Sequence, residues 1–142
     1  MRGRVLVAYD DSEQSTEALE FALREFGDAT LLVLAIVDPG EANTKRLFSM
    51  PTFASEWYED AREEAQDRLA EATELATVAG VDVETDVVVG RPAKTIVEYA
   101  NEHDCDHIVT GSHGRSGVSR IVLGSVAETV VRRSPVPVTV VR

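Results

Sequence analysis

The sequence is poor in cysteine and in aromatic residues, and it contains no long apolar run. Cys105 is the only cysteine, so no disulfide can form within the chain, and this usage suits a reducing compartment. No stretch of about eighteen apolar residues is present, and the N-terminal segment lacks the small-residue cleavage site of a signal peptide. We therefore expect a cytoplasmic protein that crosses no membrane. A buried core position is favoured over a catalytic thiol for Cys105.

Basic residues are scarce relative to acidic ones. The chain has 25 Asp and Glu residues against 14 Lys and Arg residues, a formal net charge of -11, and its only lysines are Lys45 and Lys94. This charge opposes general binding to nucleic acid or to anionic membranes. An acidic, lysine-poor chain resembles the halophilic proteins of organisms that keep molar salt in the cytosol, where salt screens the repulsion. An ordinary acidic cytosolic protein is the alternative.

Two common nucleotide-binding motifs are also missing. The chain lacks the P-loop pattern G-x-x-x-x-G-K-[ST], and no G-x-G-x-x-G follows its first apolar run. Fast ATP hydrolysis would need a carboxylate that holds a metal and a residue that orients water. Asp10 could bind Mg²⁺ through water, but no clear general base faces it, and His103 and His107 lack the spacing of a metal site. We predict no catalytic residue.

The sequence alternates continuous apolar runs with segments whose apolar residues recur at the three- and four-residue spacing of a helix. The runs typical of strands in a parallel sheet cover residues 5–8, 30–37, 81–89, 107–110 and 136–141, with 81–89 suited to an edge. Helical patterns follow between Ser12 and Gly27, over 53–79, after Pro92 and over 125–133, while 38–52 has no clean period. The pattern predicts one domain, residues 1–142, in the doubly wound α/β class.

The glycine-rich stretch from Thr110 to Ser125 lies between the fourth apolar run and the last helical pattern. Glycine lets the backbone approach a ligand closely, so a strand, a glycine-rich loop and a helix start together indicate a phosphate-binding site. Ser125 followed three residues later by Glu128 predicts a capping box at the helix start. Glycines that serve only as turn residues are the alternative interpretation.

The glycine spacing resembles a family signature. Two residues separate Gly111 from Gly114 and nine separate Gly114 from Gly124-Ser125, similar to the G-2x-G-9x-G(S/T) pattern of the ATP-binding branch of the universal stress protein family. Residues 5–10 and 135–141 extend the resemblance. It implies the strand order 3-2-1-4-5, ATP as the ligand with Mg²⁺ as a candidate companion ion, and a homodimer formed through the C-terminal strand. Strand order then reverses between the strands that end at Asp10 and Gly111, where open parallel sheets bind ligands.

The resemblance also implies individual contacts. Asp10 would accept hydrogen bonds from ribose or adenine, and Ile36 would pack against adenine. Separately from the resemblance, Arg115 and Arg120 are the only nearby cations expected to offset phosphate charge, and surface positions are the alternative for both. The predicted nucleotide-binding residues are Tyr9, Asp10, Ile36, Thr110, Gly111, His113, Gly114, Gly124, Ser125 and Val126. A capping role for Asp10, a plain core role for Ile36 and a solvated side chain for His113 remain open alternatives.

Three functions are compatible with this sequence. The first is an ATP-binding stress-response or regulatory module that acts as a homodimer with little or no intrinsic hydrolysis. The second is a slow nucleotide hydrolase or nucleotidyl transferase that uses the same site. The third is an interaction protein that binds no nucleotide. The first is favoured by the motif match, since function has to be argued from the site rather than from the fold.

Overall fold

The computed structural model describes residues 3–40, 51–113 and 123–142. Within these ranges the elements are β1 (Arg4–Ala8), α1 (Glu13–Glu25), β2 (Thr30–Val37), α3 (Pro51–Val78), β3 (Val83–Val89), α4 (Pro92–Glu102), β4 (His107–Gly111), α5 (Ser125–Arg133) and β5 (Val138–Val141). All neighbouring strands are parallel, and their order is β3-β2-β1-β4-β5. The doubly wound α/β class and the predicted strand order are confirmed.

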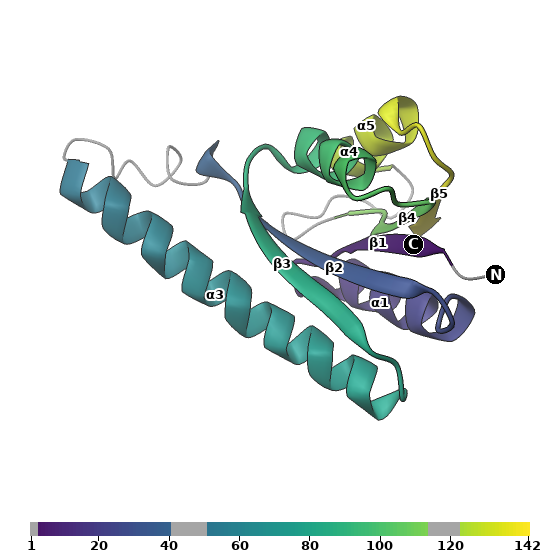
Figure 1. Cartoon of the computed structure of the whole chain (residues 1–142). Coiled ribbons are helices and arrows are strands. Elements are labelled where there is room, and N and C mark those ends of the chain that lie inside the picture. The colour runs from purple at the N-terminus through teal and green to yellow at the C-terminus, as the bar shows by residue number, and fades with distance from the viewer. Residues whose placement is uncertain (1–2, 41–50, 114–122) are drawn as a thin grey trace.

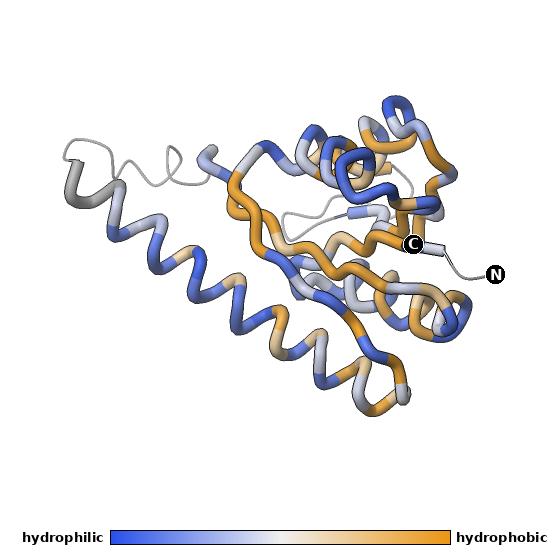
Figure 2. The backbone as a smooth tube through the Cα atoms, viewed as in Figure 1, coloured by the Kyte–Doolittle hydropathy of each residue, from blue (hydrophilic) through white to orange (hydrophobic). Residues whose placement is uncertain are grey.

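Helices cover both faces of the sheet (Figure 1). Val5 and Val7 share one core with α1 and α3, whereas Leu6, between them on β1, shares the other core with α4 and α5. Because successive side chains of a strand point to opposite faces, a strand covered on both sides has to be apolar throughout. The apolar colouring follows the central strands in Figure 2. This explains why the strand signals were continuous apolar runs.

Helix α1 begins directly after Ser12, in agreement with the helical pattern predicted between Ser12 and Gly27. The Ser12 hydroxyl accepts a hydrogen bond from the Ser15 backbone N–H at 3.1 Å, so Ser12 is the N-cap. Asp11 instead has a φ of 58°, in the left-handed region that few residues other than glycine adopt. The connection from β1 to α1 is therefore a tight turn built by Asp10, Asp11 and Ser12.

Helix α3 begins two residues earlier than predicted, at Pro51. Its apolar stripe packs on the sheet through buried side chains, which are Trp57, Ala65, Leu69, Ala72 and Ala76. Gly80 follows the helix with a φ of 74°, which glycine adopts without steric cost. Most of the irregular segment predicted over 38–52 lies outside the described residues.

Two strand boundaries differ from the sequence prediction. Strand β3 begins at Val83 rather than at residue 81 and is an edge strand, as predicted. Strand β5 begins at Val138 rather than at residue 136, and proline, which has no backbone N–H to donate to a sheet, stands immediately before it at Pro137. In the described part of the chain, no helix is long and apolar enough to cross a membrane.

The cysteine and two of the histidines lie in packing positions. Cys105 is buried, and burial raises the pKa of its thiol. His103 stacks on Tyr99 with a centroid distance of 3.8 Å. His107 lies within hydrogen-bond distance of the Thr139 hydroxyl, at 2.7 Å, and burial lowers the pKa of its imidazole. The core position predicted for Cys105 is confirmed, and of the two histidines His107 joins β4 to β5.

Candidate functional site: a cavity at the carboxyl edge of the sheet

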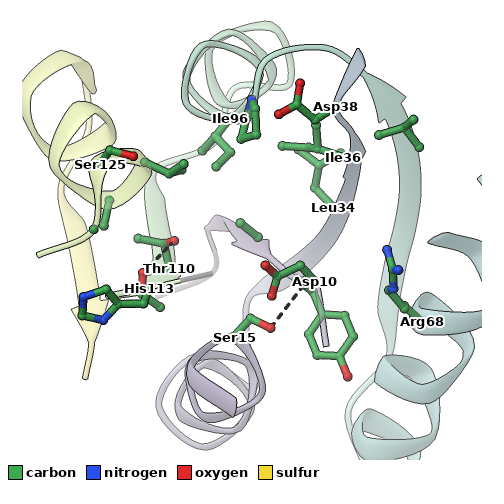
Figure 3. A pocket seen from close by; sticks show the side chains of 18 of the residues that line it. Asp10, Ser15, Leu34, Ile36, Asp38, Arg68, Ile96, Thr110, His113 and Ser125 are labelled. Atoms are coloured by element: carbon green, nitrogen blue, oxygen red, sulfur yellow. Dashed lines mark hydrogen bonds between the residues drawn. The ribbon is translucent and has the colours of Figure 1, made fainter. Parts of the chain in front are cut away.

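A cavity of about 450 Å³ opens at the carboxyl edge of the sheet. The segments that follow β1 and β4 form its floor, the end of β2 and the helices α3 and α4 form its walls, and α5 begins beside it (Figure 3). This is the point where strand order reverses, because β2 lies on one side of β1 and β4 on the other. The volume lies within the range of about 300–1,000 Å³ that is usual for small-molecule sites.

The cavity floor contains the turn after β1. One carboxylate oxygen of Asp10, Oδ1, accepts hydrogen bonds from the Ser12 backbone N–H at 3.1 Å and from the Ser12 hydroxyl at 2.5 Å. The Asp10 backbone N–H donates to the hydroxyl of Ser15 at 3.2 Å, and both Asp10 and Ser15 line the cavity. Ser12 rather than Asp10 caps α1, so the capping alternative for Asp10 is wrong. The Asp10 carboxylate closes the turn and lies in the cavity floor.

Apolar side chains form the wall at the end of β2. Leu34, Ile36 and Ile96 line this part of the cavity, and Figure 3 shows the three side chains gathered on one side of it. Ile36 also packs against the core on the α4 and α5 face, so its core role and its cavity position coexist. Tyr9 also lines the cavity, with only 4% of its surface exposed, and burial raises the pKa of its phenol. A flat apolar ring could pack against this wall, because its contact with apolar side chains removes apolar surface from water without burying a polar group.

Helix α5 begins at Ser125, as predicted, but the predicted capping box is wrong. Gly124 is the N-cap residue, so Ser125 is already the first helical residue and cannot cap. Glu128 instead pairs with Arg132 one turn further along the helix. Because glycine has no side chain, Gly124 offers no acceptor to the first N–H groups of α5, beside which the cavity opens.

Gly124 is required by close packing rather than by its backbone dihedral angles. Its φ of -63° suits any residue, but a Cβ atom built there would lie 2.7 Å from the Ser112 carbonyl oxygen and 3.4 Å from Cδ2 of His113. The Gly124 N–H donates to the same carbonyl at 2.8 Å. The glycine thus holds the start of α5 directly against the segment that follows β4.

His113 is buried, which contradicts the solvated alternative for its side chain. It is 4% exposed and lines the cavity, and its Nδ1 lies 3.2 Å from the Ser112 hydroxyl. Among the described residues, no hydrogen-bond partner meets its buried Nε2. In Figure 3 the ring points away from Asp10, so the backbone rather than the ring is the part nearest the middle of the cavity.

Charged side chains line the cavity from the segments after β1 and β2 and from α3. Asp10, Asp38 and Glu64 contribute carboxylates, and Arg68 contributes a guanidinium. Arg68 was not among the predicted cations, and the predicted ones, Arg115 and Arg120, lie outside the described ranges. The sequence offered a signal for Arg68. At helical spacing it lies on the same face of α3 as Ala65 and Ala72, so a charged residue interrupts a stripe of small residues that faces the sheet.

The structure gathers the predicted residues around one cavity. Those that line it are Tyr9, Asp10, Ile36, Thr110, Gly111, His113, Gly124, Ser125 and Val126, and Gly114 lies outside the described residues. Sequence reasoning did not single out Ser15, Asp38, Arg68 or Ile96, which also line it. Ser15 and Ile96 carried only helical core signals, so only the packing of α1 and α4 reveals their place in the cavity.

Comparison with known proteins agrees with this architecture. The model of the universal stress protein family matches residues 1–142. Universal stress protein MJ0531 of Methanocaldococcus jannaschii is 34% identical over 145 residues, which cover 98% of this chain and 81% of the relative. The solved structure of MJ0577 from the same organism has a TM-score of 0.84 at 30% identity and covers 99% of this chain and 96% of its own. A universal stress protein solved in complex with cAMP has a TM-score of 0.63 at 28% identity, with coverages of 99% and 97%. This chain belongs to the universal stress protein family.

Proposed function

We propose that this protein is an ATP-binding stress-response or regulatory module that acts as a homodimer with little or no intrinsic hydrolysis. The observation that carries the proposal is the cavity itself, which combines an apolar wall at Ile36 with the start of α5, where the N-cap residue Gly124 has no side chain to cap the helix. A purine ring suits the first, and an anion suits the second, because the N–H groups and the dipole of a helix start attract negative charge. The relative solved with cAMP supports an adenine nucleotide as the ligand.

The carboxylates that line the cavity favour a nucleotide that binds together with a cation. Three carboxylates line the cavity with a single guanidinium among the described residues, and the chain as a whole carries a net charge of -11. An uncompensated triphosphate would be repelled by this field. Mg²⁺ bound to the phosphates would reduce the repulsion. Asp10 would then face the nucleoside part of the ligand and accept hydrogen bonds from ribose or adenine. The proposed ligand is therefore ATP with Mg²⁺.

Calorimetric titration with ATP, ADP, AMP and cAMP, with and without Mg²⁺, tests this function. We expect ATP with Mg²⁺ to bind, and at a hundred times its Kd to stabilise the folded state by about 2.7 kcal/mol. In Asp10→Asn the Oδ1 acceptor used by Ser12 remains while the charge is lost, so this variant should fold and bind the nucleotide more weakly. An absence of binding by every nucleotide would contradict the proposal and favour an interaction protein. Release of ADP that Asp10→Asn abolishes would favour the hydrolase.

The proposed homodimer forms through β5, the edge strand at the C-terminal end of the sheet order. Its four residues, Val138 to Val141, are uncharged and only half-buried, so the isolated strand would present an apolar edge. Antiparallel pairing of two copies about a two-fold axis would cover that edge. We expect light scattering to give twice the chain mass of 15.5 kDa at micromolar concentration.

A charge placed on the edge strand provides the matched test of this dimer. Val140→Lys should yield monomers, because a lysine on an edge strand opposes pairing. Val78→Lys adds the same charge at a side chain that is 91% exposed at the end of α3, and should stay dimeric. Wild-type protein with the mass of one chain would contradict the assembly.

The acidic surface also supports a saline cytosol as the working environment. The chain's net charge of -11 repels itself when unscreened, and the Debye length falls from about 30 Å at 0.01 M salt to about 3 Å at 1 M. We expect the melting temperature to rise from near-zero to molar KCl. Equal melting temperatures across that range would identify an ordinary acidic cytosolic protein.

A further inference from the structure

Arg68 reaches the cavity from α3, a helix that the glycine motif does not involve. Its side chain is only 19% exposed, although it carries a full charge. In Figure 3, Arg68 and Ser125 lie on opposite sides of the cavity, with Asp10 between them. Arg68 therefore lies far from the start of α5, which is the part of the cavity suited to phosphate.

The Arg68 guanidinium connects α3 to the turn after β1. Its Nε lies 3.5 Å from a carboxylate oxygen of Asp11, and its Nη2 lies 3.5 Å from a carboxylate oxygen of Glu64 on the same helix. The side chain of Asp11 is 37% exposed and that of Glu64 is 67% exposed, so the pair with Asp11 is the better shielded of the two. Of these two ion pairs, only the one with Asp11 joins separate elements of the fold.

The turn that receives this contact needs support. Asp11 has a φ of 58°, a conformation that is sparsely populated for residues with a side chain and persists when surrounding contacts maintain it. Asp10 precedes it directly, and the Asp10 carboxylate accepts the hydrogen bonds of Ser12 that close the turn. A shift at Asp11 would consequently move the Asp10 carboxylate in the cavity floor.

We propose that Arg68 is a positioning residue which, by pairing with Asp11, holds the turn so that Asp10 faces the nucleoside part of a bound nucleotide. The inference rests on the proposed function, since it names a residue of the same site. A direct contact between Arg68 and phosphate is the competing role. The two differ in one respect: positioning affects adenosine and ATP alike, whereas a phosphate contact affects ATP alone.

Calorimetric titration of adenosine and of ATP with Mg²⁺ into four variants tests this role. The titrations use about 1 M KCl, where the Debye length of about 3 Å suppresses general charge effects. We expect Arg68→Gln and Asp11→Asn each to weaken both ligands by the same factor, about two- to tenfold, and the double variant to be no weaker than either one. Asn tolerates the positive φ of position 11. Arg68→Lys should recover part of the loss, because it restores the charge near Asp11.

Arg62→Gln is the matched control, because it removes the same charge from an exposed position of α3 that does not line this cavity. It should bind both ligands as the wild type does. Unchanged adenosine affinity in Arg68→Gln overturns the inference, and so does an equal loss in Arg62→Gln. Additive losses in the double variant overturn the route through Asp11. Wild-type protein that binds neither ligand would overturn the proposed function itself, a result distinct from all of these.

Discussion

Gly124→Val is expected to abolish the response to ATP while the chain still folds. The valine Cβ would lie 2.7 Å from the Ser112 carbonyl oxygen, closer than two such atoms can approach, so the start of α5 has to move away from β4. Overpacking of this kind costs about 1–3 kcal/mol. The displaced N–H groups would no longer meet an anion in the cavity. Thermal melts with and without ATP should show a lower melting temperature and no shift of several degrees on adding ATP.

Gly27→Val separates the loss of stability from the loss of the site. Gly27 follows α1 at the end remote from the cavity, and a Cβ there would lie 2.9 Å from the Leu23 carbonyl oxygen. The two substitutions thus create similar backbone clashes, and only one of them lies at the cavity. Gly27→Val should melt lower and still respond to ATP. If ATP still raises the melting temperature of Gly124→Val, the phosphate-binding role is wrong and the glycines serve only as packing and turn residues.

Leu6→Ala should produce the largest loss of stability of the substitutions considered. Leu6 is fully buried in β1, the middle strand of the sheet, and its register partners Leu32 and Ile108 belong to the same core cluster. Truncation removes buried apolar atoms and leaves a cavity that the surrounding side chains fill only in part. This should lower the free energy of unfolding by about 2–5 kcal/mol. Urea unfolding followed by circular dichroism should show this as a lower midpoint with an unchanged slope.

The control for this substitution is Val78→Ala on the last turn of α3. Val78 is 91% exposed, so its truncation should change the free energy of unfolding by no more than about 0.5 kcal/mol. Both variants have to be compared with the wild type at one protein concentration, because assembly makes apparent stability depend on concentration. A loss below about 1 kcal/mol in Leu6→Ala would mean that the core repacks around the smaller side chain.

The order of strands and helices along the chain could be predicted from the sequence, because each element depends on a pattern of neighbouring residues. Continuous apolar runs at β1 and β2 mark strands covered on both faces, and Ser12 and Pro92 mark helix starts through their own backbone chemistry. The glycine spacing also located the cavity, since the ends of parallel strands meet at one edge of a sheet. These features require only residues near one another in the chain.

The sequence by itself determined the alternation of strands and helices, the edge position of β3 and most of the residues around the cavity. Only the tertiary structure decided that Gly124 rather than Ser125 caps α5, because the carbonyl of Ser112 occupies the space where a side chain at position 124 would lie. It also decided that Arg68 reaches the cavity and meets Asp11, 57 positions away in the chain. Such contacts depend on how α3 packs against the sheet, and local periodicity carries no information about a partner so distant in sequence.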